Sequence, residues 1–138
     1  MMNTEHSPMV IDTSAFAAVL FGAADAEQYL DAMDFSTRCF CSAMTWFETA
    51  AVVAAEKGRE GVQRFHELCM ELDLECIPFE KGQAEIAFDA WLRYGKGNHQ
   101  AGLNLGDCAS YALARTLNDR LLFKSEGFRA TDIPSALP

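Results

Sequence analysis

Apolar and polar residues follow two different periods along this chain, one typical of short buried strands and one typical of amphipathic helices. Short apolar or β-branched runs predict strands at 9–11, 37–41, 74–78 and 121–123, and a further edge strand at 131–133. Apolar residues spaced three and four positions apart predict helices at 15–21, 25–33, 44–57, 59–72, 81–94 and 107–117. Because strands and helices take turns, we expect an α/β fold, a three-layer α/β/α domain with a mainly parallel sheet of four to five strands.

The helical periods also predict which side chains face the core. In the helix after the second strand, Phe47 and Val52 fall on the apolar side. In the helix after the third strand, the same is true of Phe88 and Leu92. Gly58 separates the two helices that follow the second strand, which predicts an αα-hairpin there.

The composition suits one globular domain in a reducing compartment. The chain has 138 residues and is 50% hydrophobic, enough for one core, so we expect a single domain at 9–138 after a flexible extension at 1–8. No apolar run approaches the roughly 20 residues of a membrane span, and the first residues lack the apolar centre of a signal peptide. The five cysteines show no disulfide or C-x-x-C spacing, so we expect five buried thiols. These features predict a cytoplasmic protein without membrane contact.

The formal net charge of −9 changes which partners are expected. Nucleic-acid binding through a broad basic surface is disfavoured, because such binding needs Lys and Arg to neutralise phosphates. An acidic balance is compatible with a cluster of carboxylates that binds divalent cations, and with a basic partner that covers this cluster.

Three acidic residues stand where a predicted strand ends or a predicted helix begins, and they are Asp12, Glu48 and Asp107. In a parallel sheet the carboxyl ends of the strands meet at one edge, so three segments could direct acids at one point. Carboxylates that lie within a few ångströms of one another raise one another's pKa unless a cation lies among them. Because all the ligands would be oxygen atoms, the expected ion is Mg²⁺ or Mn²⁺.

Each acid also has a purely structural interpretation. Asp12 could stabilise the amino end of the next helix, Glu48 could close a capping box with Thr45, and Asp107 could lie in a first turn capped by Asn104. The alternative to an enzyme is therefore a non-catalytic, protein-binding α/β module in which the acids only cap helices.

Two hydroxyl residues follow the first acid. Thr13 and Ser14 could position water or metal ligands, or they could cap the helix, with Ser14 as the N-cap. A phosphatase that uses Asp12 as a covalent nucleophile usually has a second acid two residues further on, and Ser14 occupies that place, so this interpretation is set aside.

Several stretches together resemble the PIN-domain ribonucleases of VapC-type toxins from toxin–antitoxin modules. The resemblance runs from Met9 to Ile133, and the stretches that carry it are MVIDTSA at 9–15, Glu48, RYGKG at 93–97, AGLNLGDCASYALA at 101–114, LLFK at 121–124 and TDI at 131–133. It implies a compact α/β/α nuclease in which Asp12, Glu48 and Asp107 hold Mg²⁺ or Mn²⁺. It also implies a VapB-like antitoxin that inserts a basic residue into the acidic site.

One departure from the family pattern concerns a fourth acid. Related sequences often have Phe-Lys-Gly-Asp-Asp-Phe where this chain has FKSEGF at 123–128. Glu126 keeps a carboxylate in this loop and is our preferred fourth catalytic acid, with Asp132 as the alternative. Ser125 could instead orient a water molecule.

The resemblance predicts a metal-dependent endoribonuclease that hydrolyses an RNA phosphodiester with a metal-activated water and leaves a 5′-phosphate and a 3′-hydroxyl. The candidates for RNA contact are cationic residues or histidine, namely Arg93, Lys96, His99, Arg115, Lys124 and Arg129. Phe16, Leu20 and Phe21 are expected to pack in the core, with a groove for an antitoxin helix as the alternative. A homodimer is compatible with the sequence, which leaves the oligomeric state open.

Overall fold

The computed structural model describes residues 8–138, so the expected extension at 1–8 lies outside the described residues except for Pro8. Four strands form one sheet in the order β3-β2-β1-β4, and all neighbouring pairs are parallel. In chain order, the elements are β1 (Met9–Ile11), α1 (Thr13–Leu20), α2 (Ala26–Phe35), β2 (Cys39–Ser42), α3 (Ala43–Glu71), β3 (Glu75–Ile77), α4 (Lys81–Tyr94), α5 (Leu105–Leu117), β4 (Arg120–Leu122) and the 3₁₀ helix η2 (Glu126–Ala130).

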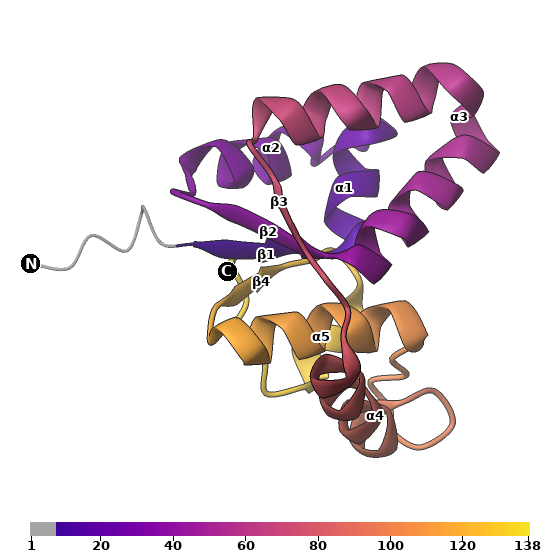
Figure 1. Cartoon of the computed structure of the whole chain (residues 1–138), viewed down its shortest axis with the longest axis vertical. Helices are drawn as coiled ribbons and strands as arrows, with labels where there is room; N and C mark the ends of the chain where they lie inside the picture. The colour runs from indigo at the N-terminus through magenta and orange to yellow at the C-terminus, as the bar shows by residue number, and fades with distance from the viewer. Residues whose placement is uncertain (1–7) are drawn as a thin grey trace, which may run out of the picture.

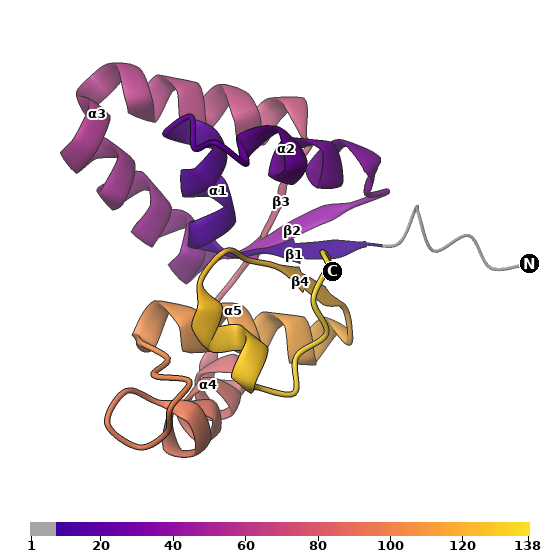
Figure 2. The same ribbon diagram turned by 180° about the vertical axis from the view of Figure 1, so that it is seen from behind.

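The sheet is covered on both faces, as Figures 1 and 2 show. Helices α1, α2 and α3 lie on one face, and α4, α5 and η2 lie on the other. Side chains of the central strand β1 alternate between two hydrophobic cores, with Val10 in the core beneath α4 and α5, and Met9 and Ile11 in the core beneath α1 and α3. The predicted three-layer α/β/α fold with a parallel sheet is confirmed.

The expected edge strand at 131–133 does not form. Thr131 Oγ1 donates to Phe128 O and accepts from Ile133 N, which keeps this segment in a local turn. The chain instead meets β4 two residues later, through a single parallel bridge between Leu121 and Ser135. The sheet therefore has four strands among the described residues.

The two helices predicted on either side of Gly58 are the two arms of α3. Gly58 has φ 62° and ψ −152°, so the helix changes direction there, and Figure 1 shows its arms diverging from the kink. The first arm begins at the sheet and the second returns to the edge strand β3. The predicted break at Gly58 is confirmed, but the two arms form one kinked helix and not an αα-hairpin with a connecting loop.

The predicted inner face of the first arm of α3 is wrong. Phe47 is 63% exposed and Val52 is 37% exposed, whereas Thr45, Thr49 and Val53 are buried. The two threonine hydroxyls find partners in the interior, since Thr49 Oγ1 donates to Thr45 O and Thr45 Oγ1 lies 3.1 Å from Ser110 Oγ. Burial of these hydroxyls therefore carries little desolvation cost.

The predicted inner face of α4 is wrong for Phe88 and Leu92. Phe88 and Leu92 are 62% and 56% exposed, while Ala87 and Ala90 are buried in the core shared with α5. Small side chains at these two positions let α4 approach α5 closely. The larger side chains are left at the surface.

The five cysteines are not all buried. Cys39, Cys41 and Cys108 are buried, Cys69 is half-buried, and Cys76 is exposed because it lies on the edge strand β3. In the part of the chain that the structure describes, no helix combines the length and hydrophobicity needed to cross a membrane.

Candidate active site at the carboxyl ends of the strands

Asp12 directly follows β1 and is held by three hydrogen bonds. It is 1% exposed and, as the N-cap of α1, its Oδ2 accepts from Ser14 N at 3.0 Å and Ser14 Oγ at 2.6 Å. Its Oδ1 accepts from Ser110 Oγ of α5 at 2.6 Å. The N-cap is thus Asp12 and not Ser14, and both carboxylate oxygens are fixed in direction.

Ser14 joins this acid to the loop after β4. Its Oγ donates to Asp12 and accepts from Lys124 N at 2.8 Å and from Ser125 N at 3.2 Å. The backbone of the loop that was expected to carry the fourth acid therefore lies next to Asp12.

Glu48 caps no helix, so its structural interpretation fails. The N-cap of α3 is Ser42, which places Glu48 in the second turn instead of in a capping box with Thr45. Glu48 Oε1 accepts from Thr13 Oγ1 at 2.8 Å, and a Cβ at Gly106 would lie 2.6 Å from Glu48 Oε2. Burial raises the pKa of the Glu48 carboxyl, the Thr13 hydrogen bond opposes this effect, and the charge of Asp12 adds to it.

Asp107 lies in the first turn of α5 and does take part in a capping box. Asn104 Oδ1 accepts from Asp107 N at 2.8 Å, and Asp107 Oδ2 accepts from Asn104 N at 3.0 Å. Burial raises the pKa of the Asp107 carboxyl to about 6; the Asn104 N–H counteracts this, and the charges of Asp12 and Glu48 raise it further. The charge of Asp12 thus acts on Glu48, and the charges of Asp12 and Glu48 act on Asp107, so acids from three segments lie in one region of the molecule.

Buried hydroxyl groups support these acids, and two of them, on Ser110 and Thr49, were not predicted from the sequence. Ser110 gives its only hydroxyl proton to Asp12, so in the pair at 3.1 Å Thr45 must be the donor to Ser110. Thr49 Oγ1 lies 3.1 Å from Thr13 Oγ1, the hydroxyl that binds Glu48. The usable signal was spacing, since Ser110 lies three residues after Asp107 and Thr49 four after Thr45, on one face of each helix.

Neither candidate for the fourth acid joins the three. The Glu126 side chain is 85% exposed and pairs with Arg129 at 3.5 Å. Asp132 accepts from Tyr111 Oη at 2.6 Å and lies 3.8 Å from Arg93 and from Arg115. Burial would raise the pKa of Asp132, but this hydrogen bond and the two guanidinium groups lower it overall.

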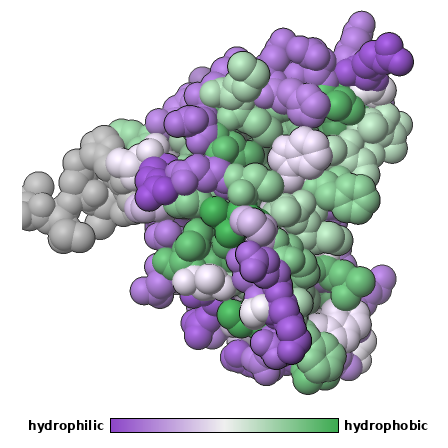
Figure 3. Space-filling model, viewed as in Figure 1, coloured by the Kyte–Doolittle hydropathy of each residue, from purple (hydrophilic) through white to green (hydrophobic). Residues whose placement is uncertain are grey.

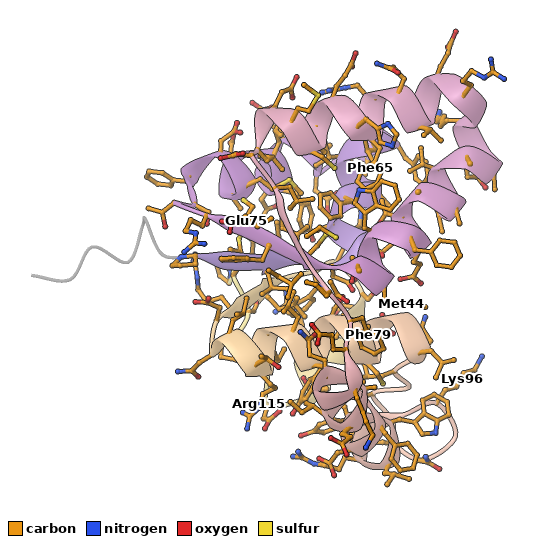
Figure 4. The ribbon with its side chains drawn as sticks, in the orientation of Figure 1. Met44, Phe65, Glu75, Phe79, Lys96 and Arg115 are labelled. Carbon is orange, nitrogen blue, oxygen red and sulfur yellow. The ribbon has the colours of Figure 1, made fainter. Side chains whose placement is uncertain are left out.

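The candidates for RNA contact do not form one patch. Arg93 and Arg115 line a hollow of about 500 Å³ between α4 and α5, whereas Lys124 Nζ donates to Asp25 at 2.9 Å beside the first helices. Figure 4 shows Lys96 and Arg115 on opposite sides of the α4–α5 layer. Arg129 stacks over Phe123, and His99 accepts from Ala101 N within its own loop.

An apolar groove of about 400 Å³ begins beside the acidic site. Its lining comes from α3, α4, α5 and the segment before α4, namely Met44, Phe79, Ala84, Ala87, Phe88, Trp91, Leu105, Cys108 and Ala109. Figure 4 shows Met44 and Phe79 near each other where α3 begins, and Figure 3 shows hydrophobic side chains at the surface in the same view. Leu105, two residues before Asp107, is 69% exposed.

Core packing, the expected role of three apolar residues of the first helix, is confirmed for Phe16. Phe16 is fully buried and meets Phe65 edge to face with ring centroids 5.4 Å apart. Leu20 and Phe21 are half-buried, and Leu20 packs against the same core. The alternative, a groove for an antitoxin helix, is wrong for Phe16 because this side chain is not at the surface.

The chemistry of the acids suits a hard cation, although the side chains are not gathered around one point. Within residues 8–138, no set of three acidic, histidine or cysteine side chains is arranged as the ligands of a single metal ion. The donors at the site are nevertheless carboxylate and hydroxyl oxygens, and the pKa values of Glu48 and Asp107 are raised by burial first and by the charge of neighbouring acids in addition. Such a donor set fits Mg²⁺ or Mn²⁺ better than zinc.

Comparisons with known proteins give consistent results. The PIN domain family matches residues 9–134. The chain is 40% identical over 131 residues to Ribonuclease VapC30 of Mycobacterium tuberculosis (94% of this chain, all of the relative) and 41% identical over 125 residues to Ribonuclease VapC of Mycolicibacterium smegmatis (91% and 97%). A similar fold occurs in M. tuberculosis VapC20, described as a toxin that cleaves the sarcin–ricin loop, with a TM-score of 0.76, 16% identity and coverage of 91% and 95%.

A second solved structure of similar fold is the VapBC2 complex of Rickettsia felis bound to a promoter DNA fragment. It has a TM-score of 0.67 and 14% identity, and the match covers 93% of this chain and 96% of the other. At this level of identity the likeness concerns the fold.

Proposed function

Since the chain belongs to the PIN-domain family of VapC ribonucleases, we propose that it is an endoribonuclease that depends on Mg²⁺ or Mn²⁺ and acts as the toxin of a toxin–antitoxin pair. The observation that carries the proposal is the position of Glu48. This carboxylate caps no helix, is half-buried, and lies in the electrostatic reach of two further acids from other segments. A structural role in helix capping accounts for Asp12 and Asp107 but not for Glu48.

The proposed metal ligands are Asp12, Glu48 and Asp107. A divalent cation bound by them supplies positive charge for the scissile phosphate and lowers the pKa of an attacking water. The chain itself supplies orientation. Ser14 and Ser110 hold the two oxygens of Asp12, and Thr13 holds Oε1 of Glu48, so both acids keep their direction before substrate arrives.

A partner with a basic segment suits the same site. The proposed antitoxin resembles VapB and places an Arg or Lys among the three carboxylates, where it offsets their charge and blocks access to the phosphate. The net charge of −9 favours such a partner. Because the proposed substrate is RNA and the proposed partner is an antitoxin, we propose that the protein acts in the cytoplasm.

Manganese titration tests the proposal and its alternative, the non-catalytic module. We expect saturable Mn²⁺ binding to the whole protein by calorimetry, together with RNA cleavage that EDTA abolishes. Asp12→Asn, Glu48→Gln and Asp107→Asn should each weaken binding and reduce cleavage by at least about 100-fold, the upper end of what loss of a partner behind a metal ligand costs. Asp31→Asn, a matched change of an exposed acid on α2, should alter neither. Absence of both Mn²⁺ binding and cleavage in the wild type would favour the binding module.

A second pair of variants distinguishes the two candidates for the fourth acid. We propose Glu126, because its loop is joined to Asp12 through Ser14, while the carboxylate of Asp132 is bound by Tyr111 and two arginines. Glu126→Gln should therefore lower the rate of RNA cleavage more than Asp132→Asn does. The reverse order in a single-turnover assay would exclude Glu126 and favour Asp132.

A further inference from the structure

Three cysteines that play no part in the proposed chemistry come together at the edge of the sheet. Cys41 of β2 and Cys76 of β3 are direct partners in the parallel register, and Cys69 lies near the end of α3. Cys41 is fully buried, Cys69 is half-buried and Cys76 is exposed. Burial raises the pKa of the Cys41 thiol, and the neighbouring Cys76 and Cys69 raise it further.

The pair formed by Cys41 and Cys76 fits a disulfide better than the other pairs. Neighbouring strands lie about 4.8 Å apart, which falls inside the roughly 4.4–6.8 Å between Cα atoms that a disulfide spans. The register makes Cys41 and Cys76 direct neighbours on adjacent strands, with their side chains on the same face of the sheet, whereas Cys69 lies on helix α3. Cys76 belongs to a three-residue edge strand with one neighbour only, so small shifts of β3 disturb little else.

We propose that Cys41 and Cys76 form a reversible disulfide when the protein meets a hydroperoxide. The hydroperoxide takes up two electrons as it transfers an OH group to the exposed Cys76 thiol, which leaves a sulfenic acid and an alcohol or water. The Cys41 sulfur then attacks the Cys76 sulfur, and the departing OH leaves as water with the Cys41 proton. Cys76 reacts with the oxidant first because it is exposed, whereas Cys41 is fully buried and out of reach of the hydroperoxide.

This bond would connect the two ends of α3. Cys41 lies two residues before α3 begins at Ala43, and Cys76 follows its end at Glu71 by five residues. The disulfide would thus close both arms of α3 and the Gly58 kink into one covalent loop. Because such a loop restricts the unfolded chain, the oxidised protein should unfold at a higher urea concentration than the reduced protein. This inference does not depend on the proposed ribonuclease function.

Peptide mass spectrometry after treatment with hydrogen peroxide tests the proposal. The whole protein is reduced, desalted, treated, and alkylated before digestion with trypsin and Glu-C. Cleavage after Glu71 and Glu75 separates Cys69 from Cys76, and a Cys39→Ser background removes the ambiguity between Cys39 and Cys41. We expect a peptide that links Cys41 to Cys76, that has lost two hydrogen atoms, and that disappears on reduction.

Two variants separate this pair from its neighbour. The link should be lost in Cys76→Ser, an exposed position where the fold is expected to survive, and should persist in Cys69→Ser. The higher urea midpoint on oxidation should likewise be lost in Cys76→Ser. A link through Cys69, a disulfide between two chains through Cys76, or Cys76 oxidised to a sulfinic acid without any link would each overturn the proposal.

Discussion

At the scale of single residues, the acidic site depends on positions with small side chains or hydroxyl groups as much as on its acids. Gly106 precedes Asp107 and leaves the space that the Glu48 carboxylate occupies. Thr13 and Ser110 each donate a hydrogen bond to one acid, so the two acids are directed from α1 and α5. The arrangement therefore responds to substitutions that leave every acid in place.

Gly106→Ala should disturb the site without changing its charge. The added Cβ would overlap the Glu48 carboxylate, so either Glu48 or α5 must move, at a cost of about 1–3 kcal/mol in the free energy of unfolding. Urea denaturation with and without Mn²⁺ measures this cost and the loss of metal binding. In a Glu48→Ala background the same substitution should cost much less. Equal costs in both backgrounds would show that the glycine does not serve Glu48.

The raised pKa of Asp107 predicts a pH effect with a defined sign. With a folded pKa of about 6 against an ordinary value of 3.8, Asp107 binds its proton more tightly in the folded state. Metal-free protein should therefore lose stability from this group as pH rises from about 4 to 6. The free energy of unfolding of Asp107→Asn, relative to that of the wild type, should therefore increase by about 1–2 kcal/mol between pH 4.5 and pH 7, after a discount for partial exposure. A constant difference in urea denaturation with EDTA would contradict this assignment.

The same proton competes with the cation. Because a ligand must be deprotonated to bind, Mn²⁺ affinity should fall by up to about tenfold for each pH unit below 6. Calorimetry at pH 5 and pH 7 measures the change. Affinity that is independent of pH over this range would place Asp107 outside the set of ligands.

At the scale of elements, the helices are placed by small groups and not by their largest apolar residues. The first arm of α3 turns Thr45, Thr49 and Val53 inward and leaves Phe47 exposed. This rotation brings Glu48 beside Gly106, and the hydroxyl pair of Thr45 and Ser110 ties α3 to α5. The rotation of α3 about its axis therefore also determines where Glu48 lies in the acidic site.

Two glycine variants test the conformation of α3. Gly58→Ala should lower the free energy of unfolding by about 1 kcal/mol, because an L-residue at φ 62° is strained although no atom lies near the new Cβ. Gly82→Ala is the matched control in α4, where the Cβ is equally free and φ is helical, so it should raise stability by about 0.5–1 kcal/mol. Thermal or urea denaturation gives both values. Similar effects in the two variants would mean that the kink imposes no strain.

At the scale of the whole molecule, an acidic domain presents an apolar groove next to its acids. Phe88 and Leu105 stay largely exposed along this groove, which a lone soluble domain seldom maintains without a partner. We propose that two copies of the chain form a homodimer through this face. Ala87 and Ala90 are buried against α5, so Phe88 on the other side of α4 is left exposed and available for this contact.

Phe88→Glu tests the homodimer. The new charge should convert a dimer into a monomer in analytical ultracentrifugation, because each copy would bury an unpaired carboxylate at the interface. Phe35→Glu, at a similarly exposed phenylalanine on α2, is the control and should leave the sedimentation unchanged. If wild-type protein sediments as a monomer at micromolar concentration, or if both variants behave alike, the groove is not a dimer interface.

The local sequence was sufficient to predict the three-layer arrangement, the parallel sheet and three candidate acids. The reason is that the ends of strands, the starts of helices and the breaks at glycines depend on neighbouring residues. The local sequence did not determine the rotation of α3 and α4, the separation of Glu126 and Asp132 from the three acids, or the pairing of Cys41 with Cys76. Periodicity favours the largest apolar side chains as the buried face. Whether Thr45 can be buried instead depends on a hydroxyl 65 residues away, and only the tertiary structure brings that partner to it.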